Sequence, residues 1–231
     1  MTRAIFDTES NGFLREATVI WCLVFKDLDT QQVYQYALDE VEEGLYRLGE
    51  YDIIGGHNIC GHDVPLIKKL YPDWTYKKLR DTYCMSKLFH PERHTGHSLE
   101  SYGEQFHRPK VGHEEWNIFS DAMLYRCSED VEINVLTYKY LVDRYCRDWD
   151  WIDSLELEQQ YAINQAYQEL EGVDINRELA NELVAQLDLE IATLDKILLE
   201  RIPKRVKQVG ATVTRPFKKD GTLSKMATDW I

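Results

Sequence analysis

The sequence has 231 residues, of which 44% are hydrophobic and 12% aromatic, so the chain can form a folded core and is not a disordered segment. It contains no apolar run of about 18 residues and no secretory-signal layout at its N-terminus, so we expect no membrane partner. The net charge of −13 is at first sight unfavourable for nucleic-acid binding, because phosphate recognition normally shows as a basic surplus.

Residues 1–150 show the pattern of a mixed α/β domain. Apolar runs at 4–6 and 18–25, followed by the alternating segment 32–37, predict three strands of an antiparallel meander. After the meander, helices and strands alternate. The remaining predicted elements are a strand over 52–56 and helices over 39–48, 64–70, 83–89, 98–106 and 121–145. This order is typical of an α/β fold of the ribonuclease-H-like kind, a mixed sheet with flanking helices.

The sequence changes character near residue 150, and we predict two domains, 1–150 and 151–231, that meet there. The second part is helical: one helix over 155–170 ends near Gly172, and another begins at Asn176 and carries a leucine-rich stripe. Charge is also uneven, with a net −10 over residues 151–200 and +6 over 201–231. An Asp-Gly pair within 217–223 predicts a hairpin-like turn in this basic tail.

Three segments place carboxylates at the ends of predicted strands or near the start of predicted helices. Asp7 and Glu9 follow the first strand, and because they are two residues apart, both side chains face the same side of the sheet. Asp63 precedes a helix, and Asp130 lies near the start of the helix over 121–145. Taken singly, they have ordinary explanations: a solvated strand end, a helix N-cap and a solvated helix acid. Their order and local sequence, taken jointly, favour a shared site.

The motifs DTES (7–10), HNICGHDV (57–64) and YRCSEDVEIN (125–134) resemble the three exonuclease motifs of family A DNA polymerases. Residues 1–150 as a whole resemble the 3′→5′ proofreading exonuclease domain of the short-tailed phage polymerases, in the DEDD exonuclease superfamily. The resemblance implies a ribonuclease-H-like fold and release of nucleoside 5′-monophosphates from a DNA 3′ end. Residues 151–231 resemble the helical start of the polymerase portion. Since the polymerase motifs are absent from the sequence, the chain is either a truncated piece of a longer polymerase or a naturally short exonuclease unit. The abrupt end of the sequence favours truncation, in which case the remainder of a polymerase is the expected partner.

The resemblance also implies that Asp7, Glu9, Asp63 and Asp130 converge on two Mg²⁺ or Mn²⁺ ions, with Asp7 as the bridging ligand and Glu9 helping to orient the attacking water. Two cations about 4 Å apart can activate a water, neutralise the phosphate and stabilise the leaving oxygen. Carboxylate oxygens are the hard ligands that these ions prefer. Without metal, the four carboxylates would repel one another, and the pKa of some of them would rise.

One position departs from the family. Family A exonucleases place a tyrosine four residues before the last aspartate, but here that position is Arg126, and Tyr125 lies five residues before Asp130. On a regular helix, five residues place Tyr125 about 140° from the face of the aspartate. We expect Tyr125 to position the attacking water through an irregular first turn, with Arg126 as the alternative contact to phosphate or water.

Four further residues match family positions that contact the substrate. The backbone at Thr8 is expected near the 3′ end and Asn58 near the terminal nucleotide. Phe13 corresponds to an apolar wedge between the last bases, although ordinary core packing explains a phenylalanine equally well. His97 falls in a segment that faces the cleft of the family, which favours substrate contact or a simple hydrogen bond.

The leading prediction is a two-metal 3′→5′ exodeoxyribonuclease that acts on single-stranded or frayed DNA 3′ ends. A 3′→5′ exoribonuclease of the same superfamily is the alternative, because the sequence leaves the discrimination of the ribose 2′-hydroxyl open. An inactive DNA-binding module is a second alternative, but all four carboxylates are present. Five single, scattered cysteines indicate a cytoplasmic protein, in the host cytoplasm if a phage encodes it.

Overall fold

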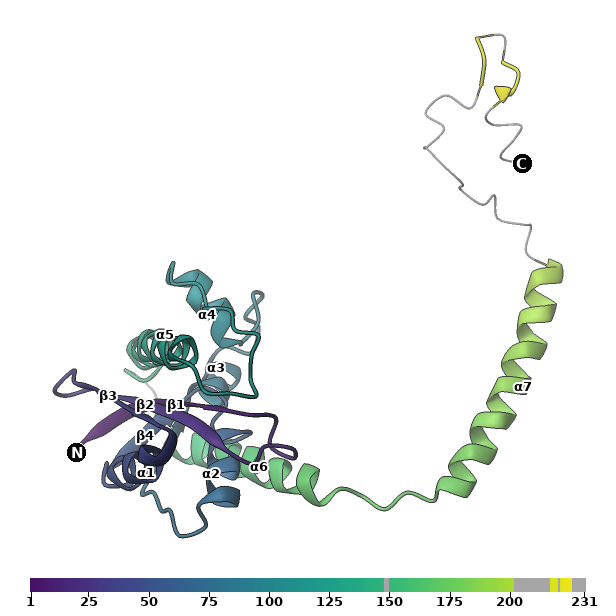
Figure 1. Ribbon diagram of the computed structural model, residues 1–231. Coiled ribbons are helices and arrows are strands. Elements are labelled where there is room, and N and C mark those ends of the chain that lie inside the picture. Colours follow the sequence, from purple (N-terminus) through teal and green to yellow (C-terminus); the bar gives the residue numbers. More distant parts are fainter. Residues whose placement is uncertain (148–149, 202–216, 220, 226–231) are drawn as a thin grey trace. The chain divides into compact units, whose positions relative to one another are not determined.

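The structure, a computed structural model, describes residues 1–147, 150–201, 217–219 and 221–225 (Figure 1). The strands are β1 (Arg3–Ser10), β2 (Ile20–Asp27), β3 (Val33–Ala37), β4 (Ile53–Gly56) and β5 (Leu79–Asp81). They form one sheet in the order β3-β2-β1-β4-β5. The first three strands are antiparallel, whereas β4 pairs with β1, and β5 with β4, in parallel. This mixed sheet confirms the predicted α/β fold class.

Alternation along β1 sends neighbouring side chains into two separate cores. Helices α1 (Val41–Gly49) and α5 (Asp121–Tyr145) cover opposite faces of the sheet (Figure 1). Phe6 belongs to the same buried cluster as Leu45 of α1, whereas Ile5 belongs to the cluster of Val131 in α5. Both faces are therefore apolar, and the period-two pattern determines which residues of β1 face α5.

The predicted helices of the first 150 residues are present within about two residues of their expected ends. Besides α1 and α5 they are α2 (Asp63–Leu70), α3 (Thr82–Phe89) and α4 (Leu99–Gln105). A 3₁₀ turn, Leu38–Glu40, precedes α1. Ser120 and Ser98 cap α5 and α4, because the hydroxyl oxygen of each accepts a hydrogen bond from the third backbone N–H that follows. Strand β5 was missing from the predicted elements, because three residues are too few to show a periodicity.

The first compact unit extends to Val173, so the boundary predicted at residue 150 is wrong for the packing of the chain. Helix α6 (Ile152–Glu171) packs against α2, α3 and β5. Its side chains Leu155, Ile163 and Ala166 are buried in the cores of the first unit. The helix ends as predicted at Gly172, whose φ of 77° places it in the left-handed region that favours glycine. Residues 148 and 149 of the predicted junction lie outside the described residues.

The second unit, Asp174–Ile231, contains α7 (Arg177–Arg201). Asn176 caps this helix as predicted, since its Oδ1 accepts a hydrogen bond of 3.1 Å from the backbone N–H of Leu179. A bridge between Phe217 and Leu223 supports the predicted hairpin. Most of the basic tail, 202–216 and 226–231, lies outside the described residues, and its assignment to a polymerase portion stays a prediction. Every helix in the described ranges is too short or too polar to cross a bilayer.

Candidate active site

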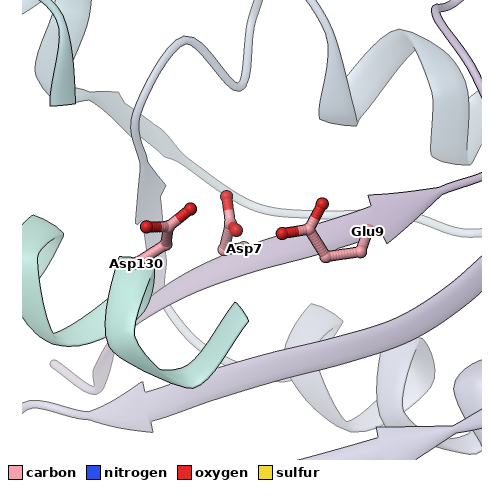
Figure 2. A group of neighbouring side chains, drawn as sticks. All are labelled: Asp7, Glu9 and Asp130. Carbon is pink, nitrogen blue, oxygen red and sulfur yellow. The ribbon is translucent and has the colours of Figure 1, made fainter. Parts of the chain in front are cut away.

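Two carboxylates of β1 and one of α5 meet above the sheet. Asp7 and Glu9 pair in register with Val24 and Cys22, which belong to the buried cluster beneath α5, so the side chains of both acids face that helix. Asp130 approaches from α5 beside Val131 (Figure 2). One carboxylate oxygen from each of the three acids lies within 4.8 Å of the other two. This separation matches a set of oxygen ligands that share cations.

The oxygens of this group are ready to accept a ligand. Glu9 is 7% and Asp130 1% exposed, yet Glu9 Oε1 and Asp130 Oδ1 have no hydrogen-bond partner. A buried carboxylate oxygen without a donor is costly, and a divalent cation would satisfy both atoms. The donor set, three carboxylates of which two have a buried oxygen without a hydrogen bond, therefore fits Mg²⁺ or Mn²⁺.

The electrostatics of the group also favour a cation. Burial raises the pKa of Asp7 well above its ordinary value, and the neighbouring carboxylates Asp63, Asp130 and Glu9 raise it further. Burial raises the pKa of Glu9 to about 7, and Asp130 adds to the rise while Arg126 opposes it. Burial likewise raises the pKa of Asp63 and that of Asp130. A divalent cation would relieve this repulsion and bind in competition with protons.

Asp63, the fourth predicted ligand, lines the same cleft but is not one of the three acids whose oxygens lie within 4.8 Å of one another. It is 4% exposed at the first position of α2, and its Oδ1 accepts a hydrogen bond of 2.5 Å from Thr8 Oγ1. Thr8 alternates with Asp7 and Glu9 along β1, so its hydroxyl links Asp63 to the strand that carries the other ligands. A role of Asp63 in metal binding stays a prediction.

Two positively charged side chains, Lys110 and Arg126, lie against the carboxylates, and the sequence did not predict the first. Lys110 Nζ is 2.8 Å from Asp130 Oδ2. Burial alone would lower the pKa of Lys110, but Asp130 and Asp7 outweigh it and the pKa is raised. Arg126 lies between two acids, with Nε 3.4 Å from Glu9 Oε1 and Nη2 3.5 Å from Asp130 Oδ2. Lys110 lies in the segment 107–120, which has no periodic pattern that could place it.

The irregular first turn expected for Tyr125 is absent. Helix α5 is α-helical from Asp121 onward, and Ser120 caps it. As a result the Tyr125 side chain is 57% exposed and is not among the residues that line the cleft, whereas the Arg126 side chain is 13% exposed and lines it. The geometry therefore favours Arg126, the alternative, as the residue that contacts water or phosphate. The catalytic role of either residue stays a prediction.

The carboxylates open into a cleft of about 980 Å³. Thr8, Phe13 and Asn58 line it, and their contact with a substrate stays a prediction. Phe13 is 83% exposed, which excludes core packing as the reason for a phenylalanine at this position. His97 is absent from the residues described around the cleft; its Nδ1 forms a hydrogen bond of 2.7 Å with Ser86 Oγ. The simple hydrogen bond was one of the two explanations expected for His97.

A buried aspartate that sequence reasoning did not single out holds the loop after β4. Asp81 is 0% exposed at the N-cap of α3, and its carboxylate accepts hydrogen bonds of 2.9 Å from the backbone N–H groups of Asn58 and Cys60. Asn58 has a φ of 61°, a left-handed conformation that these bonds help to maintain. Asp81 therefore fixes the loop that carries Asn58 and leads into Asp63.

No protein-family model matches the sequence, and a search of the curated proteins finds no match either. Solved structures are more informative. A Brucella melitensis NrnC structure with bound Mg²⁺ aligns with a TM-score of 0.57 at 16% identity, over 75% of this chain and 89% of that one. Escherichia coli RNase D and the catalytic core of Trypanosoma brucei RRP6 align with TM-scores of 0.54 and 0.52 at 12% and 15% identity. The alignment with RNase D covers 70% of this chain and 45% of RNase D. The alignment with RRP6 covers 71% of this chain and 46% of that one.

The chain has the ribonuclease-H-like fold. This fold was predicted from the order of strands and helices, and the alignments with nucleases of known structure confirm it. At identities of 12% to 16% the likeness establishes the ribonuclease-H-like fold alone. What the site does must be argued from its own residues.

Proposed function

We propose that this protein is a metal-dependent 3′→5′ exonuclease. One observation carries the proposal: carboxylate oxygens of Asp7, Glu9 and Asp130 lie within 4.8 Å of one another in an open cleft, and a buried oxygen of Glu9 and one of Asp130 have no hydrogen bond. A cluster built only for stability would be expected to pair those oxygens. The cleft is also lined by the exposed ring of Phe13, which suits a base.

The side chains divide the chemistry among them. Asp7, Glu9, Asp63 and Asp130 would hold the divalent cations, which when bound supply hydroxide at neutral pH and stabilise charge on the phosphate. Asp7 lies between Glu9 and Asp130 in Figure 2 and would be the ligand that both ions share. Arg126 can donate a hydrogen bond to the phosphate or to the attacking water from its position between Glu9 and Asp130. Thr8 holds Asp63 in place through its hydroxyl.

DNA is the proposed substrate, and proofreading within a phage-type family A polymerase is the proposed context. The motifs DTES, HNICGHDV and YRCSEDVEIN support this choice, because they follow the order and spacing of that family. The net negative charge of the chain does not prevent this site from binding a phosphate, because bound cations would reverse the local field where the phosphate would lie.

Digestion of a single DNA strand labelled at its 5′ end tests the proposal. With Mg²⁺ or Mn²⁺ we expect a ladder of products that shorten from the 3′ end, no products in EDTA, and a loss of at least about 10³-fold in rate for the double variant Asp7→Ala/Glu9→Ala. Absence of a metal-dependent ladder from the wild-type protein would contradict the proposal.

A 3′→5′ exoribonuclease is the second candidate, because one of the similar structures, Escherichia coli RNase D, is an exoribonuclease. The same assay with an RNA strand of identical sequence separates the two. A faster rate on RNA than on DNA would favour the second candidate and leave the metal site as described.

A further inference from the structure

The loop that carries Phe13 is held rigidly by its own side chains. Asn11 Oδ1 accepts hydrogen bonds of 2.9 and 3.2 Å from the backbone N–H groups of Thr18 and Val19. Within the loop, the carbonyl of Phe13 accepts a bond of 2.8 Å from the N–H of Ala17. The loop thus presents a large apolar ring, 83% exposed, at the edge of the cleft.

A lysine of α2 ties this loop to the metal site. Lys69 Nζ lies 3.0, 2.9 and 2.8 Å from the carbonyl oxygens of Leu14, Arg15 and Ala17. An ammonium group has three donors, so all of them are used on one loop. Asp63 is the first residue of the same helix. At 1.5 Å per residue, the distance between Asp63 and Lys69 along the helix axis is about 9 Å. One short helix therefore connects a predicted metal ligand with the loop that presents Phe13.

We propose that Lys69 is a positioning residue that sets the place of Phe13 relative to the scissile phosphate. This inference rests on the proposed exonuclease function and on stacking of Phe13 against the bases at the 3′ end. The Phe13 ring can stack between the last bases only if it lies at a fixed distance from the phosphodiester bond that is cut. The three hydrogen bonds of Lys69 fix that distance. Lys69 acts through Phe13, so its loss should affect substrates that carry at least two bases.

The test compares two substrates, a single-stranded DNA oligonucleotide and the p-nitrophenyl ester of thymidine 5′-monophosphate, which has only one base. For Phe13→Ala we expect kcat/KM on the oligonucleotide to fall about tenfold, as stacking energies predict. For Lys69→Met we expect a fall of about threefold or more on the oligonucleotide and a change of less than about twofold on the ester. The double variant should be no slower than Phe13→Ala alone, since both changes remove one interaction.

Lys68→Met is the matched control. Lys68 is adjacent on α2 and loses the same charge, but its ammonium binds the carbonyl oxygen of Trp74 instead of the Phe13 loop. It should behave as wild type on both substrates. An oligonucleotide rate for Lys69→Met equal to that of wild type, an equal loss on both substrates, or additive effects in the double variant would each overturn the inference. If the wild-type protein cleaves neither substrate, it is the proposed function that fails.

Discussion

Arg126 lies in the cleft between two of the proposed metal ligands. Its guanidinium lies between Glu9 and Asp130, so it offsets carboxylate repulsion and can donate to a bound phosphate. Tyr125, one residue earlier, projects from α5 with 57% of its surface exposed. The difference follows from helix geometry, because adjacent residues of a regular helix differ by about 100° in direction.

The two residues can be separated by substitution. We expect Arg126→Met to lower kcat on single-stranded DNA by about 10²-fold, since a charged donor at the reacting phosphate is lost. Tyr125→Phe should change kcat by less than about twofold, since its hydroxyl has no described role in the cleft. Single-turnover rates in Mg²⁺ measure both. A large loss for Tyr125→Phe with little loss for Arg126→Met would restore the original expectation for Tyr125.

The raised carboxyl pKa values of the site make the stability of the metal-free protein depend on pH. Burial raises the pKa of Glu9 to about 7, above that of an unfolded glutamate, so the folded state holds the proton more tightly. The resulting stability is complete below the unfolded pKa and is lost as pH rises through about 7. Between pH 6 and 8 in EDTA we expect a loss of about 1–2 kcal/mol from this group.

Asp7→Asn should reduce this loss, because it removes one carboxylate from the cluster, and thermal melts in EDTA at several pH values measure the effect. Excess Mg²⁺ should restore stability at pH 8 in the wild type but not in the variant. Glu43→Gln, which changes an exposed acid of α1, is the control and should leave the pH dependence unaltered. Stability of the metal-free wild type that rises between pH 6 and 8 would contradict this electrostatic account.

At the scale of elements, α6 completes the unit that carries the site. Gln159 of α6 is 5% exposed, and its side chain accepts a hydrogen bond of 2.7 Å from the N–H of Asp81 and donates one of 3.3 Å to the carbonyl of Leu79. These two hydrogen bonds pair backbone groups at the outer edge of β5, next to the Asp81 carboxylate that holds the Asn58 loop. The helix therefore belongs with the first 150 residues in packing.

Gln159→Ala should cost about 1–3 kcal/mol, because it leaves the buried backbone N–H of Asp81 without its partner. The Leu79 carbonyl keeps a hydrogen bond of 2.7 Å from Arg80 Nη1. Chemical denaturation of the wild type and variant gives the value. Gln160→Ala is the matched control, since Gln160 is exposed and bonds only to Asn164 in the described contacts. Equal stability of the two variants would show that α6 contributes little to the edge of the sheet.

Elements were easier to predict than contacts between them. Helix α5 has a periodic apolar pattern and β2 a long apolar run, and the position of Asp7 and Glu9 on one face follows from period two once β1 is taken as a strand. Lys110 and Asp81 could not be found in this way, because their roles depend on chain segments that meet only after folding. The boundary at 150 failed for the same reason: the buried positions of α6 are determined by the sheet it packs on.

At the scale of the whole molecule, net charge is a poor guide to what the chain binds. The surplus of 13 negative charges includes the four acids assigned to the metal site and the net −10 of residues 151–200. Bound cations would change the sign of the field in the cleft without altering the rest of the surface. The function of the protein therefore depends on whether those acids bind cations at all.

Titration of the wild-type protein with Mn²⁺ at pH 8, with free Mn²⁺ measured by electron paramagnetic resonance, tests this central claim most directly. We expect two ions per chain in the wild type, and at most one weakly bound ion in Asp7→Asn, since Asp7 is the ligand proposed to contact both. Binding at pH 6 should be weaker, because protons compete for carboxylates with raised pKa values. No binding by the wild-type protein, or equal binding by Asp7→Asn, would contradict the account.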